Sequence, residues 1–178
     1  MKITHDTLVE AARRWLSRKC RFVVCEKKTM ILCEEPDALG FTGGGLSLLI
    51  ECKTSLSDFH ADKHKPSRRI PWEAMGMKRW FMTPPGLLST SQLPEGWGLL
   101  EYRPSKHPAG HYIKQLAEPG KHQHSELNER LFLISVAANA LDALERRDQY
   151  QERRQERART VPDPLQTSLQ FRLQSPRG

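Results

Sequence analysis

The stretch PDALGFTGGGLSLLIECK, residues 36–53, carries most of the information about the fold. The three glycines at 43–45 separate two apolar runs, and glycine suits a tight hairpin loop because it reaches positive φ without a Cβ clash. Residues 46–50 are apolar on both alternating faces, the pattern of a strand that other layers cover on each side. The stretch therefore predicts an antiparallel hairpin of residues 38–42 and 46–53, with its second strand at the centre of a sheet.

The predicted hairpin brings two carboxylates together. If the three glycines form the loop, Thr42 faces Leu46, and Asp37 then lies directly opposite Glu51 with Cβ atoms ~5 Å apart on one face. Like charges repel at that separation, and a divalent cation between them removes the repulsion, since Mg²⁺ prefers oxygen ligands of this kind. Strand alternation places Lys53 on the same face as Glu51.

Two carboxylates and a lysine on one face suggest metal-assisted hydrolysis of a phosphodiester. Mg²⁺ or Mn²⁺ held by Asp37 and Glu51 would polarise the phosphate and activate a water, while Lys53 orients that water or offsets negative charge. In the alternative interpretation, Glu35 lies opposite Lys53 and the two form a surface ion pair. The register decides between them, because a slip of one residue turns Asp37 to the other face. Ser55 continues the same face and is a candidate supporting residue.

The rest of the chain alternates between helical and strand patterns. Helices have apolar side chains at a spacing of three and four residues, and strands are short β-prone runs between turn signals. Prolines interrupt the polar segment that follows the hairpin, so only short helical pieces are expected there. In chain order, the expected elements are a helix at 4–19, a strand or short hairpin at 21–33, the glycine hairpin, a helical piece at 57–64, a turn at 72–77, and strands at 78–83, 97–103 and 111–116.

A long helix is predicted for the last part of the chain, with Ser125 as its N-cap. An apolar stripe suggests that its first half packs on the core; its members are Leu127, Leu131, Ile134, Ala138, Leu141 and Leu144. Residues 145–159 offer no aliphatic side chain until Ala158, so this half projects, frays or pairs with a partner. It is our candidate surface for a homo-oligomer or a protein partner.

Three parts follow from these patterns. Residues 1–120 form the predicted core, and residues 121–159 form the long helix. The proline-containing tail at 160–178 is expected to be disordered in isolation.

Positive charge is concentrated just after the hairpin. The 178 residues hold 28 Lys and Arg against 21 Asp and Glu, and segment 53–79 alone holds seven basic and three acidic side chains. A cluster this dense attracts a polyanion, although a solvated face has the same composition. If the partner is a nucleic acid, the candidate phosphate-contacting residues are Lys63, Lys65, Arg68 and Arg69.

Other features of the sequence narrow the class. No apolar run reaches the ~18 residues that cross a bilayer, and the N-terminus lacks the apolar stretch of a secretory signal, so we expect a cytoplasmic protein without a membrane partner. The four cysteines lack CxxC spacing and are expected to be free thiols. The pair His60 and His64 would suit zinc only with further ligands, and exposed polar residues are the favoured interpretation. Trp72, Trp80, Phe81 and Trp97 would either stack on nucleic-acid bases or, by default, fill the core.

Pro36-Asp37 followed by Glu51-Cys52-Lys53 resembles the PD-(D/E)XK nuclease superfamily. The order of helix, strands, glycine hairpin, E-x-K strand, helix and strand is similar to its α/β core, a mixed central sheet flanked by helices. Residues 34–102, with ECKTSLSDFHADKHK, KRWFMTPP and LPEGWGLLEY, resemble its MmcB-like DNA-repair branch. The chain departs from that branch at His64, where an aromatic residue is expected, and at the inserted Thr54.

The resemblance implies that Asp37 and Glu51 bind the metal and that Lys53 serves catalysis. Many members add a glutamate from the first helix, and Glu10 is the only carboxylate well inside that helix here. Glu10 equally fits a capping box with Thr7, in which it has no catalytic role.

Asp58 would cap the helix after the strand or support the site, as Asp62 would.

The function that follows is a metal-dependent nuclease acting on DNA, in DNA repair or recombination. The alternative is an inactive protein of the same fold that binds nucleic acid or a protein partner.

Overall fold

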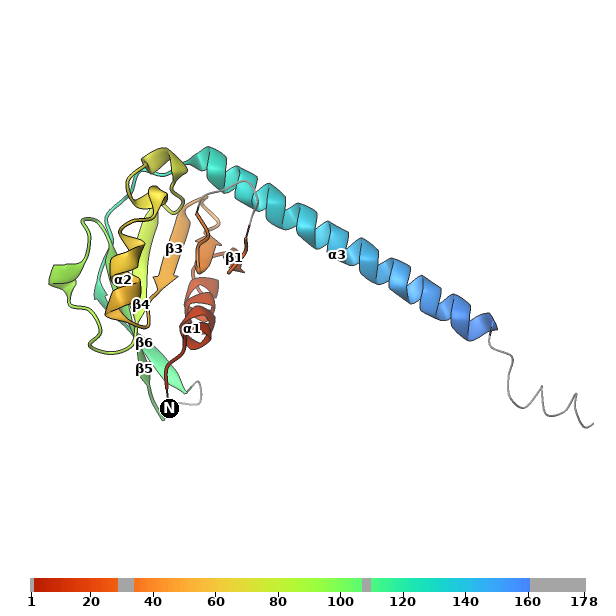
Figure 1. The fold of residues 1–178 in the computed structure, drawn as a ribbon, viewed down its shortest axis with the longest axis horizontal. Coiled ribbons are helices and arrows are strands. Elements are labelled where there is room, and N and C mark those ends of the chain that lie inside the picture. The colour runs from red at the N-terminus through yellow and green to blue at the C-terminus, as the bar shows by residue number, and fades with distance from the viewer. Residues whose placement is uncertain (1, 29–33, 107–109, 161–178) are drawn as a thin grey trace, which may run out of the picture. The chain divides into compact units, whose positions relative to one another are not determined.

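The computed structural model describes residues 2–28, 34–106 and 110–160, with side chains up to residue 157. Within these ranges the chain is an α/β protein with one mixed sheet of six strands, flanked by helices, and a long C-terminal helix (Figure 1). The strands are β1 (Phe22–Cys25), β2 (Ala38–Phe41), β3 (Ser47–Cys52), β4 (Lys78–Thr83), β5 (Gly98–Pro104) and β6 (His111–Ala117). The α-helices are α1 (His5–Ser17), α2 (Leu56–Asp62) and α3 (Glu126–Thr160).

The strands lie side by side in chain order, from β1 to β6. The β1–β2, β2–β3 and β5–β6 pairs are antiparallel, whereas β4 runs parallel to both β3 and β5. All six residues of β3 are buried, which confirms the predicted central strand. The predicted strand at 78–83 coincides with β4, and those at 97–103 and 111–116 differ from β5 and β6 by one residue at some ends. Of the predicted strand or hairpin at 21–33, β1 is the described part, and residues 29–33 lie outside the described ranges.

The glycine hairpin has the predicted register. The amide of Thr42 donates to the carbonyl of Leu46 at 2.9 Å, and Ala38 pairs with Ile50. Continuing this register by one residue places Asp37 opposite Glu51. Gly45 has a φ of 82°, in the region that glycine adopts without strain, so the loop depends on glycine at this position.

The two faces of the sheet are covered by different helices (Figure 1). α1 buries Leu8, Ala12 and Leu16 against the even-numbered residues of β3, including Ile50, in one apolar core. The helix α2 covers the opposite face, where Phe59 packs edge-to-face on Phe81 with ring centroids 5.1 Å apart. Because side chains alternate along a strand, the odd-numbered residues of β3 point toward the α2 side.

The helix α2 begins at Leu56 because Ser55 caps it. The Ser55 hydroxyl accepts a hydrogen bond from the Asp58 amide at 3.2 Å. Asp58 therefore lies in the first turn and is not the cap, so the predicted capping role of Asp58 is wrong. Two 3₁₀ turns follow, η1 (Pro66–Arg68) and η2 (Pro71–Glu73), and η2 is shorter than the turn expected at 72–77. A third turn, η3 (Thr90–Gln92), lies between β4 and β5.

The chain divides into two units, residues 1–135 and 136–178. The first unit includes residues beyond the predicted boundary at 120, since the His122 amide donates to the Met77 carbonyl and the Ser125 amide to that of Ala74. Ser125 also accepts from the Asn128 amide, as expected of the cap of α3. Within the described ranges, no helix combines the length and the apolar character needed to span a membrane.

The prediction that an apolar stripe packs the first half of α3 on the core is wrong for most of its members, although Leu131 is half-buried. Of its members, Leu127 is 65% exposed and Ile134 is 64% exposed. Leu141 and Leu144, in the second unit, are also exposed. The buried positions of α3 are instead Phe132 and Glu129, and the Glu129 carboxylate accepts a hydrogen bond from the Gly76 amide at 2.8 Å. The spacing of apolar residues cannot predict a carboxylate that is buried because it accepts a backbone hydrogen bond.

Candidate active site

The hairpin brings Asp37, Glu51 and Lys53 together at one end of β3. Asp37, directly before β2, accepts a hydrogen bond from the Cys52 amide at 2.6 Å through Oδ2. Glu51 is fully buried, and the Lys53 ammonium lies 3.3 Å from its Oε2. The expectation that Glu51 and Lys53 share one face of the sheet is therefore confirmed.

Asp37 has an unusual charge environment. Burial and the nearby Glu51 carboxylate raise the pKa of Asp37 to about 6, although the hydrogen bond from Cys52 and the charges of His5 and Lys53 act in the opposite direction. His5 is at the start of α1, with Nε2 3.5 Å from Asp37 Oδ1. A carboxyl whose pKa rises in this way is stabilised by a proton or by a cation.

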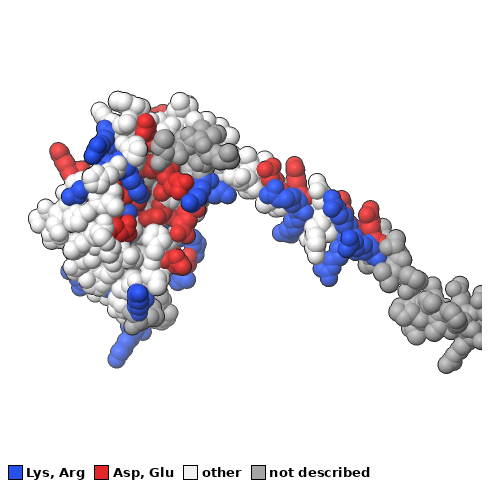
Figure 2. Space-filling model, in the orientation of Figure 1, with Lys and Arg blue, Asp and Glu red and all other residues white. Residues whose placement is uncertain are grey.

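Glu51 belongs to a larger group of charges on the α2 face, which we call the ion cluster. Lys65 Nζ lies 3.0 Å from Glu51 Oε2, and Arg68 Nη2 lies 3.2 Å from Oε1. Asp62 contacts the same three cations, with Lys53 and Lys65 at 3.0 Å and Arg68 at 2.6 Å. The cluster comprises Glu34, Glu51, Lys53, Asp62, Lys65 and Arg68. In Figure 2, acidic side chains gather in the middle of the visible face of the first unit, with basic side chains beside them.

The ion cluster favours the charged forms of Asp62 and Lys65. Burial alone would raise the pKa of Asp62, but the hydrogen bonds and charge of Arg68, with Lys53 and Lys65, outweigh burial and lower it. Burial opposes the charge of Lys65, yet Glu51 and Asp62 raise its pKa. Glu34 differs, because burial prevails there and raises the pKa of Glu34.

The predicted phosphate-contacting residues fall into two groups. Lys63 and Arg69 are exposed and remain candidates for contact with a polyanion. The Arg68 side chain is only 8% exposed, and both Arg68 and Lys65 bind carboxylates of the ion cluster. In this structure both residues pair with buried acids, and the Lys65 side chain is also 41% exposed.

The alternative pairing of Glu35 with Lys53 is wrong. Glu35 lies 3.7 Å from Lys28, whereas Lys53 contacts Glu51, Asp62 and, at 3.7 Å, Asp58. Asp58 and Asp62 thus reach the lysine of the E-x-K motif, as expected of supporting residues. Ser55 contributes as the helix cap and not as a further residue of the strand.

Glu10 does not have the capping role expected for it. The cap of α1 is Thr4 and not Thr7, so the capping box is absent. The Glu10 carboxylate binds Arg13 at 2.7 Å and Arg14 at 2.6 Å, and these hydrogen bonds lower the pKa of Glu10 to about 2.

The remaining candidates divide into core and surface residues. Trp80, Phe81 and Trp97 are buried, which confirms the default interpretation, while Trp72 is 72% exposed. Cys20, Cys25 and Cys52 are free thiols, and Cys33 lies outside the described ranges. In the part of the chain that the structure describes, no group of three or more His, Cys, Asp or Glu side chains forms a metal cage.

Asp37 and Glu51 nevertheless suit a hard cation that keeps water ligands. Glu51 Oε1 is buried and makes no hydrogen bond, although Arg68 Nη2 lies 3.2 Å from it, and Asp37 has a raised pKa. Mg²⁺ is commonly held by one or two carboxylates, with water and phosphate oxygens at its other positions. The donor set therefore fits Mg²⁺ or Mn²⁺, with the two carboxylates as its protein ligands.

Comparisons with known proteins bear on the fold alone. No protein-family model matches the chain, and no curated protein matches it. A solved structure of a protein of unknown function from Silicibacter pomeroyi is similar, with a TM-score of 0.58 and 19% sequence identity over 79% of this chain and 88% of that one. At that identity the similarity extends to the arrangement of helices and strands.

Proposed function

We propose that this chain is a divalent-metal-dependent nuclease of the PD-(D/E)XK type, which hydrolyses phosphodiester bonds in DNA. One observation carries the proposal: the buried Glu51 carboxylate, whose Oε1 makes no hydrogen bond and only an ion pair with Arg68 at 3.2 Å, lies near Asp37, and burial together with that carboxylate raises the pKa of Asp37. Two neighbouring carboxylates repel each other, and a divalent cation bound between them removes that repulsion. The DNA substrate, and a role in repair or recombination, rest on the resemblance of the sequence to the MmcB-like branch.

The residues would share the work as follows. Asp37 and Glu51 would hold Mg²⁺, which supplies a polarised phosphate and a water of lowered pKa. Lys53, 3.3 Å from Glu51, would orient the attacking water or offset the negative charge that develops on the phosphate. Asp62, 3.0 Å from the Lys53 ammonium, would keep that ammonium charged and in position.

The test is cleavage of plasmid, linear and single-stranded DNA with Mg²⁺ or Mn²⁺, compared with excess chelator. We expect cleavage only with metal, and a loss of about 100-fold or more in Glu51→Gln and in Lys53→Ala. Glu35→Gln and Lys28→Ala are matched controls, because they remove an exposed carboxylate and an exposed amine outside the site. Circular dichroism and thermal melting establish that each variant is folded. Full activity in folded Glu51→Gln would refute the assignment.

A second candidate function is binding without hydrolysis. The observation that favours it is that the Glu51 carboxylate lies within 3.0–3.3 Å of three cationic side chains, which compete with a metal ion for it. In that case Mg²⁺ has no measurable affinity for the chain, and DNA binding depends steeply on salt. Isothermal titration with Mg²⁺ in the presence and absence of DNA separates the two candidates.

A further inference from the structure

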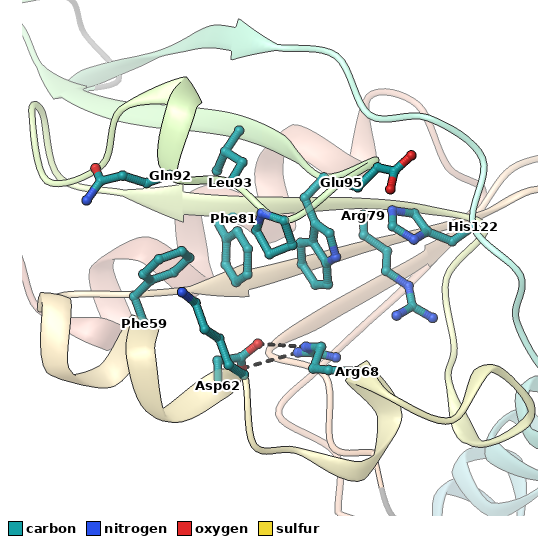
Figure 3. A pocket seen from close by; sticks show the side chains of 12 residues that line it. Phe59, Asp62, Arg68, Arg79, Phe81, Gln92, Leu93, Glu95 and His122 are labelled. Carbon is teal, nitrogen blue, oxygen red and sulfur yellow. Dashed lines mark hydrogen bonds and ion pairs between the residues drawn. The ribbon is translucent and has the colours of Figure 1, made fainter.

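A cavity of 460 Å³ lies beside the ion cluster, on the α2 face of the sheet (Figure 3). Its walls combine aromatic and cationic side chains; they include Phe59, Phe81, Trp97, Arg68, Arg79 and His122. All of its lining residues belong to the first unit of the chain. Aromatic walls lower the local dielectric, so a charge inside this cavity interacts more strongly than one on the surface.

Arg79 is the feature of the cavity that lacks an explanation within the chain. It is 3% exposed, and its Nε donates to the Gly76 carbonyl at 3.0 Å. Its Nη2 is buried without a hydrogen-bond partner, and Arg79 forms no ion pair with any of the described residues. Burial lowers the pKa of Arg79, although the charges of Glu34, Glu51 and Glu129 act in the opposite direction. A buried guanidinium without an anion is unfavourable, and a bound anion would relieve the cost.

A second guanidinium lies close to Arg79 in the cavity wall. Arg68 and Arg79 both lie over the ring of Trp97, with guanidinium carbons 4.8 and 5.8 Å from its centroid. Arg68 is compensated by the ion cluster, whereas Arg79 is not. His122 uses its Nε2 in a hydrogen bond with the Gly96 carbonyl at 2.9 Å.

Acidic residues of the cavity do not supply the missing anion. Asp62 is bound by Lys53, Lys65 and Arg68. Glu95 is exposed, and in Figure 3 its carboxylate points away from the Arg79 guanidinium. Neither carboxylate of the cavity wall therefore pairs with the Arg79 guanidinium, which lines the same cavity.

We propose that this cavity binds a phosphate monoester, with Arg79 as its principal ligand. The planar guanidinium matches the geometry of phosphate oxygens, and a monoester carries nearly two negative charges at neutral pH. A monoester also ends a molecule, so it enters a cavity more readily than a phosphodiester inside a duplex, which has chain on both sides. The monoester belongs either to the phosphorylated end of a nucleic-acid strand or to a free mononucleotide.

The inference goes beyond the proposed nuclease activity, since binding at Arg79 requires neither metal nor cleavage. The two sites are adjacent, because Arg68 and Asp62 belong both to the ion cluster and to the wall of the cavity. A strand end held at Arg79 would place the nearby backbone beside Glu51 and Lys53. The test is made in chelator so that its result does not depend on hydrolysis.

The experiment measures binding of inorganic phosphate, a nucleoside 5′-monophosphate, and one oligonucleotide with and without a 5′-phosphate. For the wild-type chain we expect the 5′-phosphate to strengthen oligonucleotide binding, and Arg79→Gln to abolish that gain, a loss of roughly 10- to 100-fold. Comparable binding of the free monophosphate would identify a mononucleotide site, whereas a preference for the oligonucleotide would identify a strand-end site. Arg130→Gln is the control, because Arg130 is exposed and does not line the cavity.

Two further measurements keep the proposal testable if Arg79→Gln does not fold. Arg79→Lys retains the charge and loses the planar fork, so its phosphate affinity should fall between those of the wild type and Arg79→Gln. In the wild-type chain, titration with phosphate should shift the side-chain NMR signals of Trp97 and His122. Equal affinity for the two oligonucleotides, or shifts confined to other residues, would overturn the proposal.

Discussion

The two faces of β3 differ in what their residues contact, and these residues alternate along one strand. Ile50 and Cys52 face α1 in a wholly apolar core. Glu51, between them, faces the other way and lies among three cations, with no exposed surface. The apolar face stabilises the fold by burial, at about 25 cal/mol per Å². On the charged face, the ion pairs must first offset the free-energy cost of removing several ions from water.

This difference separates stability from function. Replacing buried ion pairs with apolar residues of the same shape is often neutral or stabilising, so a buried ion cluster is not needed to hold a sheet together. Charged groups at such positions are typical of functional sites, where their pKa values are shifted. The next four predictions test how far the two faces differ, starting with the largest expected effect.

Removing Arg68 should have the largest effect on stability. Arg68→Ala leaves the carboxylates of Glu34, Asp62 and Glu51 with less compensation, and we expect a loss of about 3–5 kcal/mol in the free energy of unfolding. Urea unfolding of the metal-free chain measures it. Arg69→Ala, one residue along and exposed, is the matched control and should change stability by less than ~0.5 kcal/mol. Equal losses in the two variants would mean that the ion cluster contributes nothing specific.

The raised pKa of Asp37 predicts that the stability of the metal-free chain depends on pH. Its pKa is raised from 3.8 to about 6, so the folded state binds the Asp37 proton more tightly than the unfolded state. The resulting stabilisation is fully present below pH ~4 and is lost as the pH rises through ~6, a decline of about 2–3 kcal/mol.

The control for this pH dependence is Asp37→Asn, which keeps an oxygen acceptor for the Cys52 amide but does not titrate. Urea unfolding between pH 4 and 8, written as the difference between wild type and Asp37→Asn, isolates the contribution of Asp37. If that difference is flat, burial and the Glu51 carboxylate do not raise the pKa of Asp37. Mg²⁺ at saturating concentration should remove the decline, because a cation stabilises the ionised form.

The hairpin could be predicted from the sequence because its information is local. The glycine loop and the apolar run determine the register, and the register alone places Asp37 near Glu51. The ion cluster could not be predicted in the same way, since Glu34 and Arg68 are 34 residues apart and meet only after η1 docks over the sheet. Composition identified the charges of that segment as basic but not which of them are buried. The stripe on α3 failed for a related reason, because burial there follows Phe132 and Glu129.

Ile50 tests the apolar face with a smaller change. Ile50→Val removes one methylene from a fully buried position and should cost about 1 kcal/mol. The loss should be the same at low and high salt, because no charge is involved. The Mg²⁺ affinity should also be unchanged. Leu46→Val, at a position that is 41% exposed just before β3, is the control and should cost less. A salt-dependent loss in Ile50→Val would show that the two faces are coupled.

The smallest effect on stability is expected at Glu10, and the same variant tests whether Glu10 is a ligand of the metal. Its carboxylate lies with Arg13 and Arg14 on the exposed surface of α1, where ion pairs contribute between zero and about 1 kcal/mol. Glu10→Gln should therefore leave stability nearly unchanged and, if Asp37 and Glu51 are the protein ligands, should leave Mg²⁺ affinity unchanged as well. Asp37→Asn should weaken that affinity by about tenfold or more. A comparable loss in Glu10→Gln, measured by isothermal titration, would add Glu10 to the ligands and require its side chain to leave the two arginines when metal binds.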